Sequence, residues 1–378
     1  MKIQQVVIDK NIEILSSDNG FSSENANLVL AFGERELLEY LMPYELLKST
    51  YPNSQIVICS SAGQFSNNTI VVNKVVATAI SFEKTEIKLF EIDMIKTDGL
   101  LKLGEKLESE ILNTDLKALL VLSEVTTVNG TELINKIISV TESKIPVFGG
   151  LAGDGEAFQK TLVGLNANAS EGKIVMVGFY GNAIRFGFGS GGGWSDFGPE
   201  REVTKSDKNI LYKIGDRYAL DLYKEYLGQY SKDLPASALY FPLSMKENEK
   251  SEPVVRTILA INEEEKSMTF AGNIPQGSFI RLMKGNFDKL IDAAYHAGNN
   301  ALLNQSEKSK LALIVSCVGR KIVLGNRIEE ELELSKNTLG DSTTICGFYS
   351  YGEFSPNLDQ ISCELHNQTI TITTLSED

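Results

Sequence analysis

The sequence contains few of the residues that most often carry catalysis or cross-links. Among 378 residues there are two histidines, His296 and His366, and four cysteines without a CxxC spacing. Scarce histidine restricts Ser–His–Asp catalysis, and the lack of an HExxH or CxxH spacing argues against structural zinc. A chain of this length needs no disulfides to fold, so we expect reduced, buried cysteines in a cytoplasmic protein. These cysteines are Cys59, Cys317, Cys346 and Cys363.

Positive charge and long apolar runs are also scarce. Lysine and arginine total 36 against 50 acidic residues, which gives a net charge of −14 and leaves no basic run. Such a surface repels nucleic acids and anionic lipids. No apolar stretch approaches the roughly 18 residues of a membrane span, and residues 1–15 lack the regions of a signal peptide. We therefore expect no nucleic-acid or membrane partner.

Three segments of the chain share one pattern: a short apolar strand, a helix, a second strand and a turn of small residues. They occupy residues 27–63, 118–155 and 311–354. Two strands joined by one helix pair most easily in parallel. After each turn the sequence alternates polar and apolar residues, which is typical of antiparallel strands. We therefore predict an α/β fold with mixed parallel and antiparallel sheets, built from repeated strand–helix–strand–turn units followed by antiparallel strands. We expect the three units to superpose, with their turns at one sheet edge.

The stretch between the second and third units is rich in predicted strands. Residues 200–216 indicate a hairpin that turns at SDKN, and a short helix follows that ends at Gly228. A second helix is predicted over 286–303, with Asn286 as its N-cap. The run GFGSGGGW (187–194) contains a GxGxxG spacing, but turn and strand residues follow it. A dinucleotide site needs a helix there, so this run argues against a Rossmann fold.

The small-residue turns are the first candidates for a binding site. Each follows the carboxyl end of an apolar strand, where ligands usually sit in α/β sheets, and small residues expose backbone N–H groups to a ligand. The alternative is that the glycines only permit tight turns. The candidates are Ser60, Ser61, Gly63, Gly150, Asp154, Tyr351, Gly352 and Glu353.

Isolated polar residues outside the turns allow other chemistry. His296 lies in a predicted helix among alanines, as a core-edge residue or as a metal or haem ligand. His366 precedes Asn367 on a predicted strand, where the pair could face a pocket. Cys317 ends an apolar strand three residues before Arg320, and a nearby cation can lower the pKa of a thiol. A buried structural cysteine is the simpler interpretation, because histidine bases are scarce.

Seven short motifs occur in an order that resembles the FIST N and FIST C domains of intracellular signal-transduction proteins. The resemblance runs from about residue 25 to the end, and it divides the chain into a FIST N-like part (25–228) and a FIST C-like part (229–375). The motifs are CSSAG (59–63), GGLAGD (149–154), the passage 191–228, FAGNIPQGS (270–278), VSCVGR (315–320), GFYSYGEF (347–354) and LHNQTITITTL (365–375).

The resemblance implies an input module that binds a small ligand, with amino acids proposed as ligands. Our first hypothesis is a non-enzymatic cytoplasmic sensor that binds a small polar molecule between the two domains. The signal would pass to a histidine kinase or another output protein, and no output domain is visible in the chain. Two positions depart from the family pattern: the sequence WSDFG lacks the proline that usually follows GW, and Gln64 replaces a usual glutamate.

Some similar proteins bind haem and sense nitric oxide, and here His296 or His366 would be the axial ligand. Neither histidine has an evident companion, so we expect no cofactor. A hydrolase or transferase with Ser61 or Cys317 as nucleophile is a further alternative. For a zwitterionic ligand, we expect Arg320 to face a carboxylate and Glu353 an ammonium, with His366 and Asn367 nearby. Arg320 and Glu353 could instead form a salt bridge that supports the turn.

Overall fold

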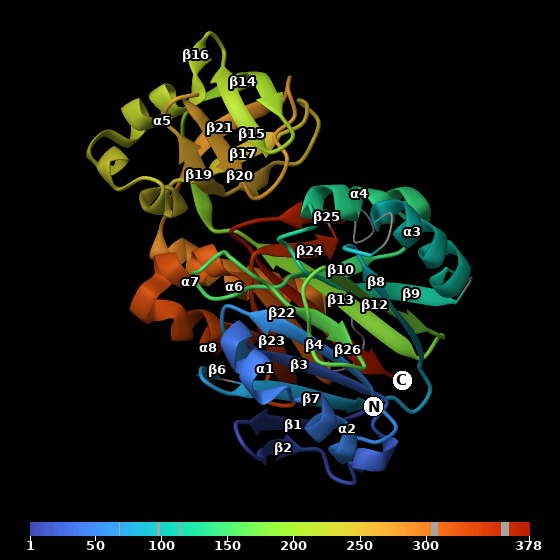
Figure 1. The fold of residues 1–378 in the computed structure, drawn as a ribbon. Helices are drawn as coiled ribbons and strands as arrows, with labels where there is room; N and C mark the ends of the chain where they lie inside the picture. Colours follow the sequence, from blue (N-terminus) through green and yellow to red (C-terminus); the bar gives the residue numbers. More distant parts are fainter. Residues whose placement is uncertain (68, 97–98, 113–114, 304–308, 357–362) are drawn as a thin grey trace.

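The molecule consists of a body built from three sheets and a separate lobe that projects from it (Figure 1). This computed structural model describes residues 1–378 except 68, 97–98, 113–114, 304–308 and 357–362. Each body sheet has six strands. Chain segments from both ends of the sequence form the body, and the lobe is made by its middle part.

Each sheet of the body contains one of the three predicted units. In every unit a helical segment joins two parallel strands, and a third strand pairs antiparallel with the first. The first unit comprises β3 (Leu28–Glu34), α1 (Arg35–Leu41), α2 (Tyr44–Thr50), β4 (Gln55–Ser61) and β7 (Val75–Ser81). The second comprises β9 (Leu116–Ser123), α4 (Gly130–Thr141), β10 (Val147–Leu151) and β12 (Lys173–Tyr180). The third comprises β22 (Leu311–Cys317), α7 (Val318–Leu324), α8 (Ile328–Leu339), β23 (Thr344–Ser350) and β26 (Ile370–Glu377).

The strand that follows each turn leaves its own unit and joins a neighbouring sheet. Thus β5 (Gln64–Ser66) pairs with β23, β11 (Val163–Leu165) pairs with β4, and β24 (Gly352–Pro356) pairs with β10. This exchange links the three units in a ring. The predicted α/β fold with mixed sheets is confirmed, whereas superposition of the three units stays a prediction.

Further strands complete the sheet edges. β1 (Lys2–Ile8) and β2 (Ile12–Ser17) extend the first sheet, β8 (Glu86–Asp93) and β25 (Cys363–His366) lie at the edges of the second, and β6 (Thr69–Val71) and β13 (Ile184–Gly191) at those of the third. The helix α3 (Gly99–Lys106) continues as a π-helical turn over Leu107–Ile111 and packs beside α4.

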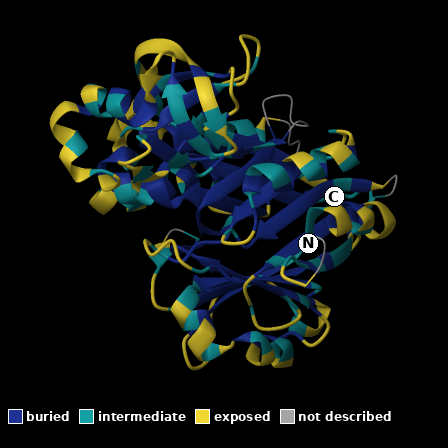
Figure 2. Ribbon diagram, turned by 45° about the horizontal axis from the view of Figure 1, so that its top comes forward, coloured by how far each residue is buried: buried dark blue, intermediate teal, exposed yellow. Residues whose placement is uncertain are grey.

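The three sheets face one another across a shared apolar core. Alternate residues of the first strand of each unit point into it, and Phe32 stacks on Phe348 there with ring centroids 4.7 Å apart. The opposite faces pack against the helices. Burial on both faces explains why these strands are apolar throughout, and Figure 2 shows them as the most buried part of the body. All four cysteines are free and buried, as predicted.

The lobe has its own core and sheet. Its strands are β14 (Trp194–Asp207), β15 (Ile210–Ile214), β16 (Arg217–Tyr218), β17 (Leu243–Lys246), β18 (Val254–Arg256), β19 (Ile258–Asn262), β20 (Ser267–Phe270) and β21 (Phe279–Gly285). The predicted hairpin is β14–β15, and α5 (Ala219–Leu227) ends at Gly228 as predicted. The core of the lobe draws on residues before and after the 228/229 boundary. The division of the chain into two parts at 228/229 therefore does not coincide with the division into lobe and body, and it stays a prediction.

The glycines of the run GFGSGGGW allow a strand and a helix to pack closely against each other. α6 (Phe287–Leu302), capped by Asn286 as predicted, lies directly on β13. A Cβ atom on Gly187, Gly189 or Gly191 would lie 1.8–2.3 Å from a carbonyl oxygen of α6. The chain continues into β14 rather than into a helix, in agreement with the expectation against a Rossmann fold.

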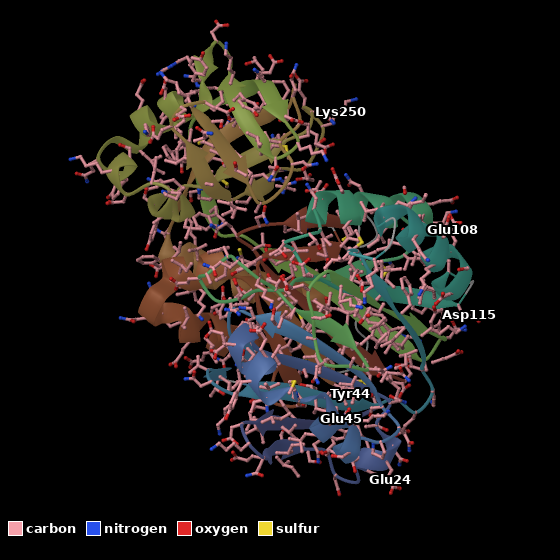
Figure 3. The ribbon with its side chains drawn as sticks, in the orientation of Figure 1. Glu24, Tyr44, Glu45, Glu108, Asp115 and Lys250 are labelled. Atoms are coloured by element: carbon pink, nitrogen blue, oxygen red, sulfur yellow. The ribbon has the colours of Figure 1, made fainter. Side chains whose placement is uncertain are left out.

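Acidic side chains are spread over the outside of the body, as the net charge of −14 requires. Glu24, Glu45, Glu108 and Asp115 project from its periphery in Figure 3, and Lys250 projects from the lobe. Within the part of the chain that the structure describes, no helix combines the length and apolar character needed to cross a membrane.

We predict that Gly189→Ala destabilises the protein by about 2 kcal/mol or more, because overpacking a tight contact forces backbone shifts. The new Cβ would lie 1.9 Å from the carbonyl oxygen of Ala297. Gly192→Ala in the same run is the control, since its nearest neighbour is the side chain of Trp194 at 3.3 Å. Urea denaturation measures both variants, and equal losses would contradict the packing role.

Candidate functional site

The three small-residue turns meet in the body through backbone hydrogen bonds. The amide of Gly153 donates to the carbonyl of Ser60 at 3.0 Å, and that of Tyr351 donates to Leu151 at 3.2 Å. The amide of Ala62 donates to Tyr349 at 2.9 Å. The three turns that were predicted from the sequence therefore do lie together, but their backbone amides donate to carbonyls of one another.

Four of the predicted turn residues form hydrogen bonds or close contacts with other residues of the protein. The Ser60 hydroxyl accepts the amide of Leu162 at 2.8 Å, and the Ser61 hydroxyl donates to the side chain of Gln64 at 2.8 Å. Gly63 adopts a φ of 133° and lies under the side chain of Lys321. A Cβ on Gly150 would lie 2.7 Å from the carbonyl oxygen of Gly352. These residues build the junction, and none of them lines the cavities described below.

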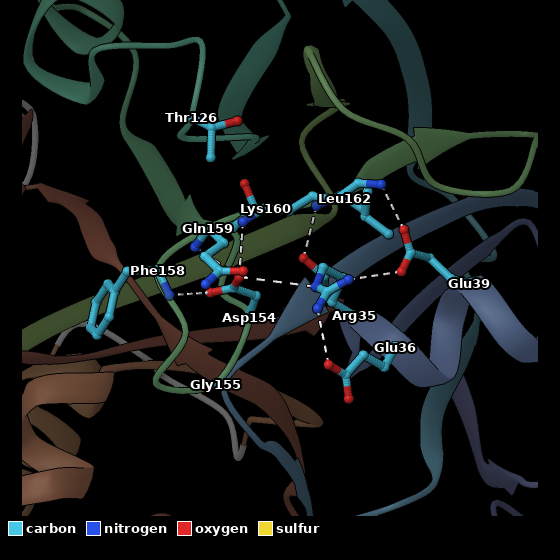
Figure 4. A network of polar contacts seen from close by, with 12 residues as sticks. Arg35, Glu36, Glu39, Thr126, Asp154, Gly155, Phe158, Gln159, Lys160 and Leu162 are labelled. Atoms are coloured by element: carbon cyan, nitrogen blue, oxygen red, sulfur yellow. Dashed lines mark hydrogen bonds and ion pairs between the residues drawn. The ribbon is translucent and has the colours of Figure 1, made fainter.

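Asp154 organises the loop that follows the second turn. Its carboxylate accepts the amides of Phe158, Gln159 and Lys160 at 2.9–3.0 Å and also binds the hydroxyl of Tyr351. Figure 4 shows the guanidinium of Arg35 approaching the same carboxylate from α1, with Nε 4.0 Å from an oxygen. These bonds hold Phe158 stacked on Tyr351, with centroids 4.5 Å apart. Asp154 is therefore a positioning residue that places an aromatic pair.

Two adjoining cavities lie where the lobe approaches the body. The outer cleft has a volume of about 1050 Å³, and the inner pocket has about 320 Å³. Phe158 from the body and Leu239 and Leu259 from the lobe line both cavities. Ligand sites commonly lie between domains in concave, mostly apolar pockets. The two cavities together are therefore the candidate binding site.

The outer cleft has aromatic walls and few charges. The 3₁₀ segments Gly228–Asp233 and Ala236–Tyr240 of the lobe form one wall, and α7 with the connection from β21 to α6 forms the other. Its charged side chains are Glu156, Asp233 and Lys284. The inner pocket is lined by Val125, Thr126, Thr257, Ala271, Cys317, Val318, Gly319 and Tyr351 besides the three shared residues.

Arg320 holds together the two connections between the lobe and the body. Its fully buried guanidinium pairs with Glu331 at 2.6 Å, donates to the carbonyl of Gly192 at 2.5 Å and to that of Leu290 at 2.6 Å. Gly192 lies where the chain enters the lobe, and Leu290 lies just after it returns. The ion pair of Arg320 is thus with Glu331 and not with Glu353, and Arg320 lines neither cavity.

The remaining predicted residues lie beside the third turn, where Glu353, Gly352 and Asn367 are buried and His366 is half-buried. Glu353 accepts hydrogen bonds from the hydroxyls of Ser350 and Thr369 at 2.6 and 2.7 Å. Burial raises its pKa to about 8, although these bonds and the charge of Arg320 act in the opposite direction. His366 lies with Nε2 3.4 Å from the carbonyl of Ser355, and burial lowers its pKa to about 4.

Asn367 and Gly352 complete this buried group. The Asn367 amide is fully buried and has no hydrogen-bond partner among the described residues. Gly352 faces the side chains of Leu365 and Leu151, where a Cβ would lie 2.9–3.0 Å away. Of the eleven predicted ligand-binding residues, only Tyr351 lines either cavity.

The residues present do not fit haem ligation in the cleft. His296 is exposed on α6, and no histidine is among the described residues that line the two cavities. The described residues also contain no group of three or more His, Cys, Asp or Glu side chains that could hold a metal.

The two nucleophile candidates differ in location. Ser61 is buried and bonded to Gln64, whereas Cys317 lines the inner pocket. Burial, with a smaller effect of Glu353, raises the pKa of the Cys317 thiol. A neutral thiol is a weak nucleophile, so this geometry does not activate it.

Most residues of the cavity walls were not predicted from the sequence. Phe158 follows the GGLAGD motif by four residues, and Ala271 belongs to the FAGNIPQGS motif. Their proximity to recognised motifs was the available signal. Leu239, Leu259 and Thr257 carry no such signal, because they are ordinary residues of the lobe.

We predict that Arg320→Met lowers the free energy of unfolding by about 3–5 kcal/mol, since it leaves the buried carboxylate of Glu331 without a counter-ion. Arg327→Met is the control, because its ion pairs lie on the surface and should contribute less than about 1 kcal/mol. Urea denaturation measures both. Similar losses in the two variants would contradict a structural role for the buried pair.

We predict that the raised pKa of Glu353 makes stability fall as pH increases. Between pH 4.5 and about 8 the unfolded chain has released this proton while the folded protein retains it, so deprotonation favours unfolding. The lowered pKa of His366 acts in the opposite direction, between pH 4 and 6.5. Above pH 6.5 the effect of Glu353 is therefore isolated.

The comparison uses Glu353→Gln, which cannot titrate. Its carboxamide oxygen can accept from one of the two hydroxyls, of Ser350 or Thr369, and its NH2 group can donate to the other. Between pH 6.5 and 8 the wild type should lose about 1 kcal/mol more per pH unit than the variant. Urea denaturation at four pH values in this range measures the difference. Parallel pH profiles would show that Glu353 is ionised in the folded protein.

Comparison with known proteins places the chain in a family. Residues 27–217 match the FIST N domain, and residues 219–356 match the FIST C domain. An uncharacterised protein of Methanocaldococcus jannaschii is 24% identical over 204 residues, which cover 50% of this chain and 38% of that protein. The match thus spans well under two thirds of that relative. Because the two domain matches together run through most of the sequence, the chain belongs to the FIST family, whose domains are associated with sensory signal transduction and small-ligand binding.

Proposed function

We propose that the protein is a cytoplasmic sensor that binds a small organic ligand in the outer cleft and inner pocket. It would act on a signalling partner, such as a histidine kinase or another output protein, without catalysing a reaction. The observation that carries this proposal is the pair of adjoining cavities, of about 1050 and 320 Å³, between the lobe and the body. A cleft of this kind suits a ligand that both parts enclose.

The walls of the outer cleft favour a ligand with an apolar or aromatic body. Tyr230, Tyr240, Phe241 and Phe287 offer aromatic surface there. Aromatic side chains contribute large apolar area and favour stacked or edge-on contacts with rings. A zwitterionic amino acid would find its charged partners among the few charged side chains of this cleft and not at Arg320 or Glu353.

The position of the cleft supports coupling between ligand binding and lobe orientation. Ile322 and Val323 line it from α7, the helix that carries Arg320, and Phe287 lines it from the start of α6. Arg320 in turn binds the carbonyls of both lobe connections. A ligand that contacts these walls shifts the equilibrium between lobe orientations if it binds one orientation more tightly than the other. A partner that contacts both parts would sense that shift.

We predict saturable binding of the neutral apolar dye N-phenyl-1-naphthylamine, whose fluorescence increases in an apolar site. Leu259→Trp should weaken this binding at least tenfold, because the larger side chain fills the junction of the two cavities. Leu101→Trp is the matched control on the surface of α3, where Leu101 is 62% exposed. Fluorescence titration measures the affinities, and thermal denaturation verifies that both variants fold.

Equal binding by the two variants would place the dye elsewhere on the protein and contradict the proposed cleft. A wild type without saturable binding would do the same. Native mass spectrometry of the purified protein provides a second readout, since a retained ligand should be present in the wild type and the control and absent from Leu259→Trp.

A further inference from the structure

The inner pocket differs from the outer cleft in the chemistry of its walls. We propose that it is a recognition subsite for an uncharged hydrogen-bonding group of the ligand, such as a hydroxyl, carbonyl or carboxamide, held by the hydroxyl of Thr257. The proposal rests on the ligand-binding function proposed above. It adds the chemical class of the bound group and the residue that selects it.

The described walls of the inner pocket include no charged side chain. They are mainly aliphatic or aromatic, with Val125, Leu239, Val318 and Tyr351 among them. A carboxylate or ammonium group would lose its hydration there without meeting an opposite charge. Burial of an unpaired charge is far more costly than burial of a neutral polar group that gains a hydrogen bond. The walls therefore select against charged groups.

Thr257 supplies the hydrogen-bonding capacity of the pocket. It lies between β18 and β19, is 5% exposed, and its hydroxyl has no hydrogen-bond partner among the described residues. Thr257 is a residue of the pocket wall, and buried polar groups are nearly always hydrogen-bonded, so we infer that its unpartnered hydroxyl is the group that meets a ligand atom. A hydroxyl can both donate and accept, which suits alcohols, carbonyls and carboxamides.

The other hydroxyl groups of the pocket wall are already engaged. The hydroxyl of Thr126 binds Glu124, and that of Tyr351 binds Asp154. Arg256, next to Thr257 in the sequence, donates to the carbonyls of Leu365 and Asn273. The thiol of Cys317 is neutral because burial raises its pKa. These bonds leave Thr257 as the main hydrogen-bonding group for a ligand.

The size of the pocket fits one substituted ring. A cavity of about 150 Å³ is sufficient for benzene, and the inner pocket has about 320 Å³. Phe158, Leu239 and Leu259 line both cavities, so a ligand that fills the inner pocket can extend into the outer cleft. The ligand class is therefore an amphipathic molecule with a neutral polar end and an apolar body.

The test uses five monosubstituted benzenes that differ in the polar group: benzyl alcohol, benzamide, benzoate, benzylammonium and toluene. Ligand-detected NMR titrations give their affinities for the full-length protein. We expect benzyl alcohol and benzamide to bind at least tenfold more tightly than benzoate and benzylammonium. Thr257→Val, which replaces the hydroxyl by a methyl group of similar size, should weaken the two neutral polar probes by about three- to tenfold. Toluene binding should not change.

Thr204→Val is the matched control, because the hydroxyl of this exposed threonine already donates to the carbonyl of Gly215. It should leave every affinity unchanged. The proposal is overturned if benzoate or benzylammonium binds as tightly as benzamide, or if Thr257→Val affects no polar probe. In either case dye binding that is sensitive to Leu259→Trp would leave the proposed function intact. A wild type that binds neither the dye nor any benzene probe would overturn both.

Discussion

The backbone hydrogen bonds between the three small-residue turns are the constraint on which the body depends. Because each turn sends the next strand into a neighbouring sheet, no sheet is complete within its own unit. The turns must therefore lie close together, and side chains such as those of Ser60 and Ser61 bond within the junction. Backbone amides that bond to protein are not available to a ligand. The same small residues that suggest a ligand site in the sequence thus form a structural joint.

The lobe depends on a different interaction. Two chain connections lead into and out of it, and the guanidinium of Arg320 binds a carbonyl in each while it pairs with Glu331. A buried ion pair contributes little net stability against a well-packed apolar alternative, but removal of one partner is costly. Here the guanidinium orients its neighbours: because it is planar, it fixes the carbonyls of Gly192 and Leu290 and the carboxylate of Glu331 relative to one another. The arrangement sets where the lobe begins and ends on the body.

Much of the fold could be predicted from local patterns, whereas most walls of the candidate site could not. Strands buried on both faces, the cap at Asn286 and the stop at Gly228 all follow from short-range physical rules. The exchange of strands between units depends on contacts between residues far apart in the sequence, which hydrophobic periodicity does not encode. Cavity residues such as Leu239 and Leu259 have the same apolar character as core residues. Arg320 stood out as a charge after an apolar strand, but nothing in the spacing identified Glu331 as its partner.

The junction of the three turns and the attachment of the lobe differ in how firmly they hold, and this difference bears on the proposed sensor function. The units of the body share strands and one apolar core, so they cannot move apart without breaking sheet hydrogen bonds. Away from its connections, the lobe touches the body through polar contacts, such as Asn129 with Asn273 at 3.1 Å and Arg256 with the carbonyl of Leu365 at 3.0 Å, and through Leu239, which packs on a small apolar cluster of α6 and α7. Elements with few buried contacts are the ones that open at low free-energy cost. Ligand binding in the cleft would therefore act on the position of the lobe and leave the body unchanged. Under the proposed function, the surface where the lobe and the body adjoin would be the part of the protein that a partner reads.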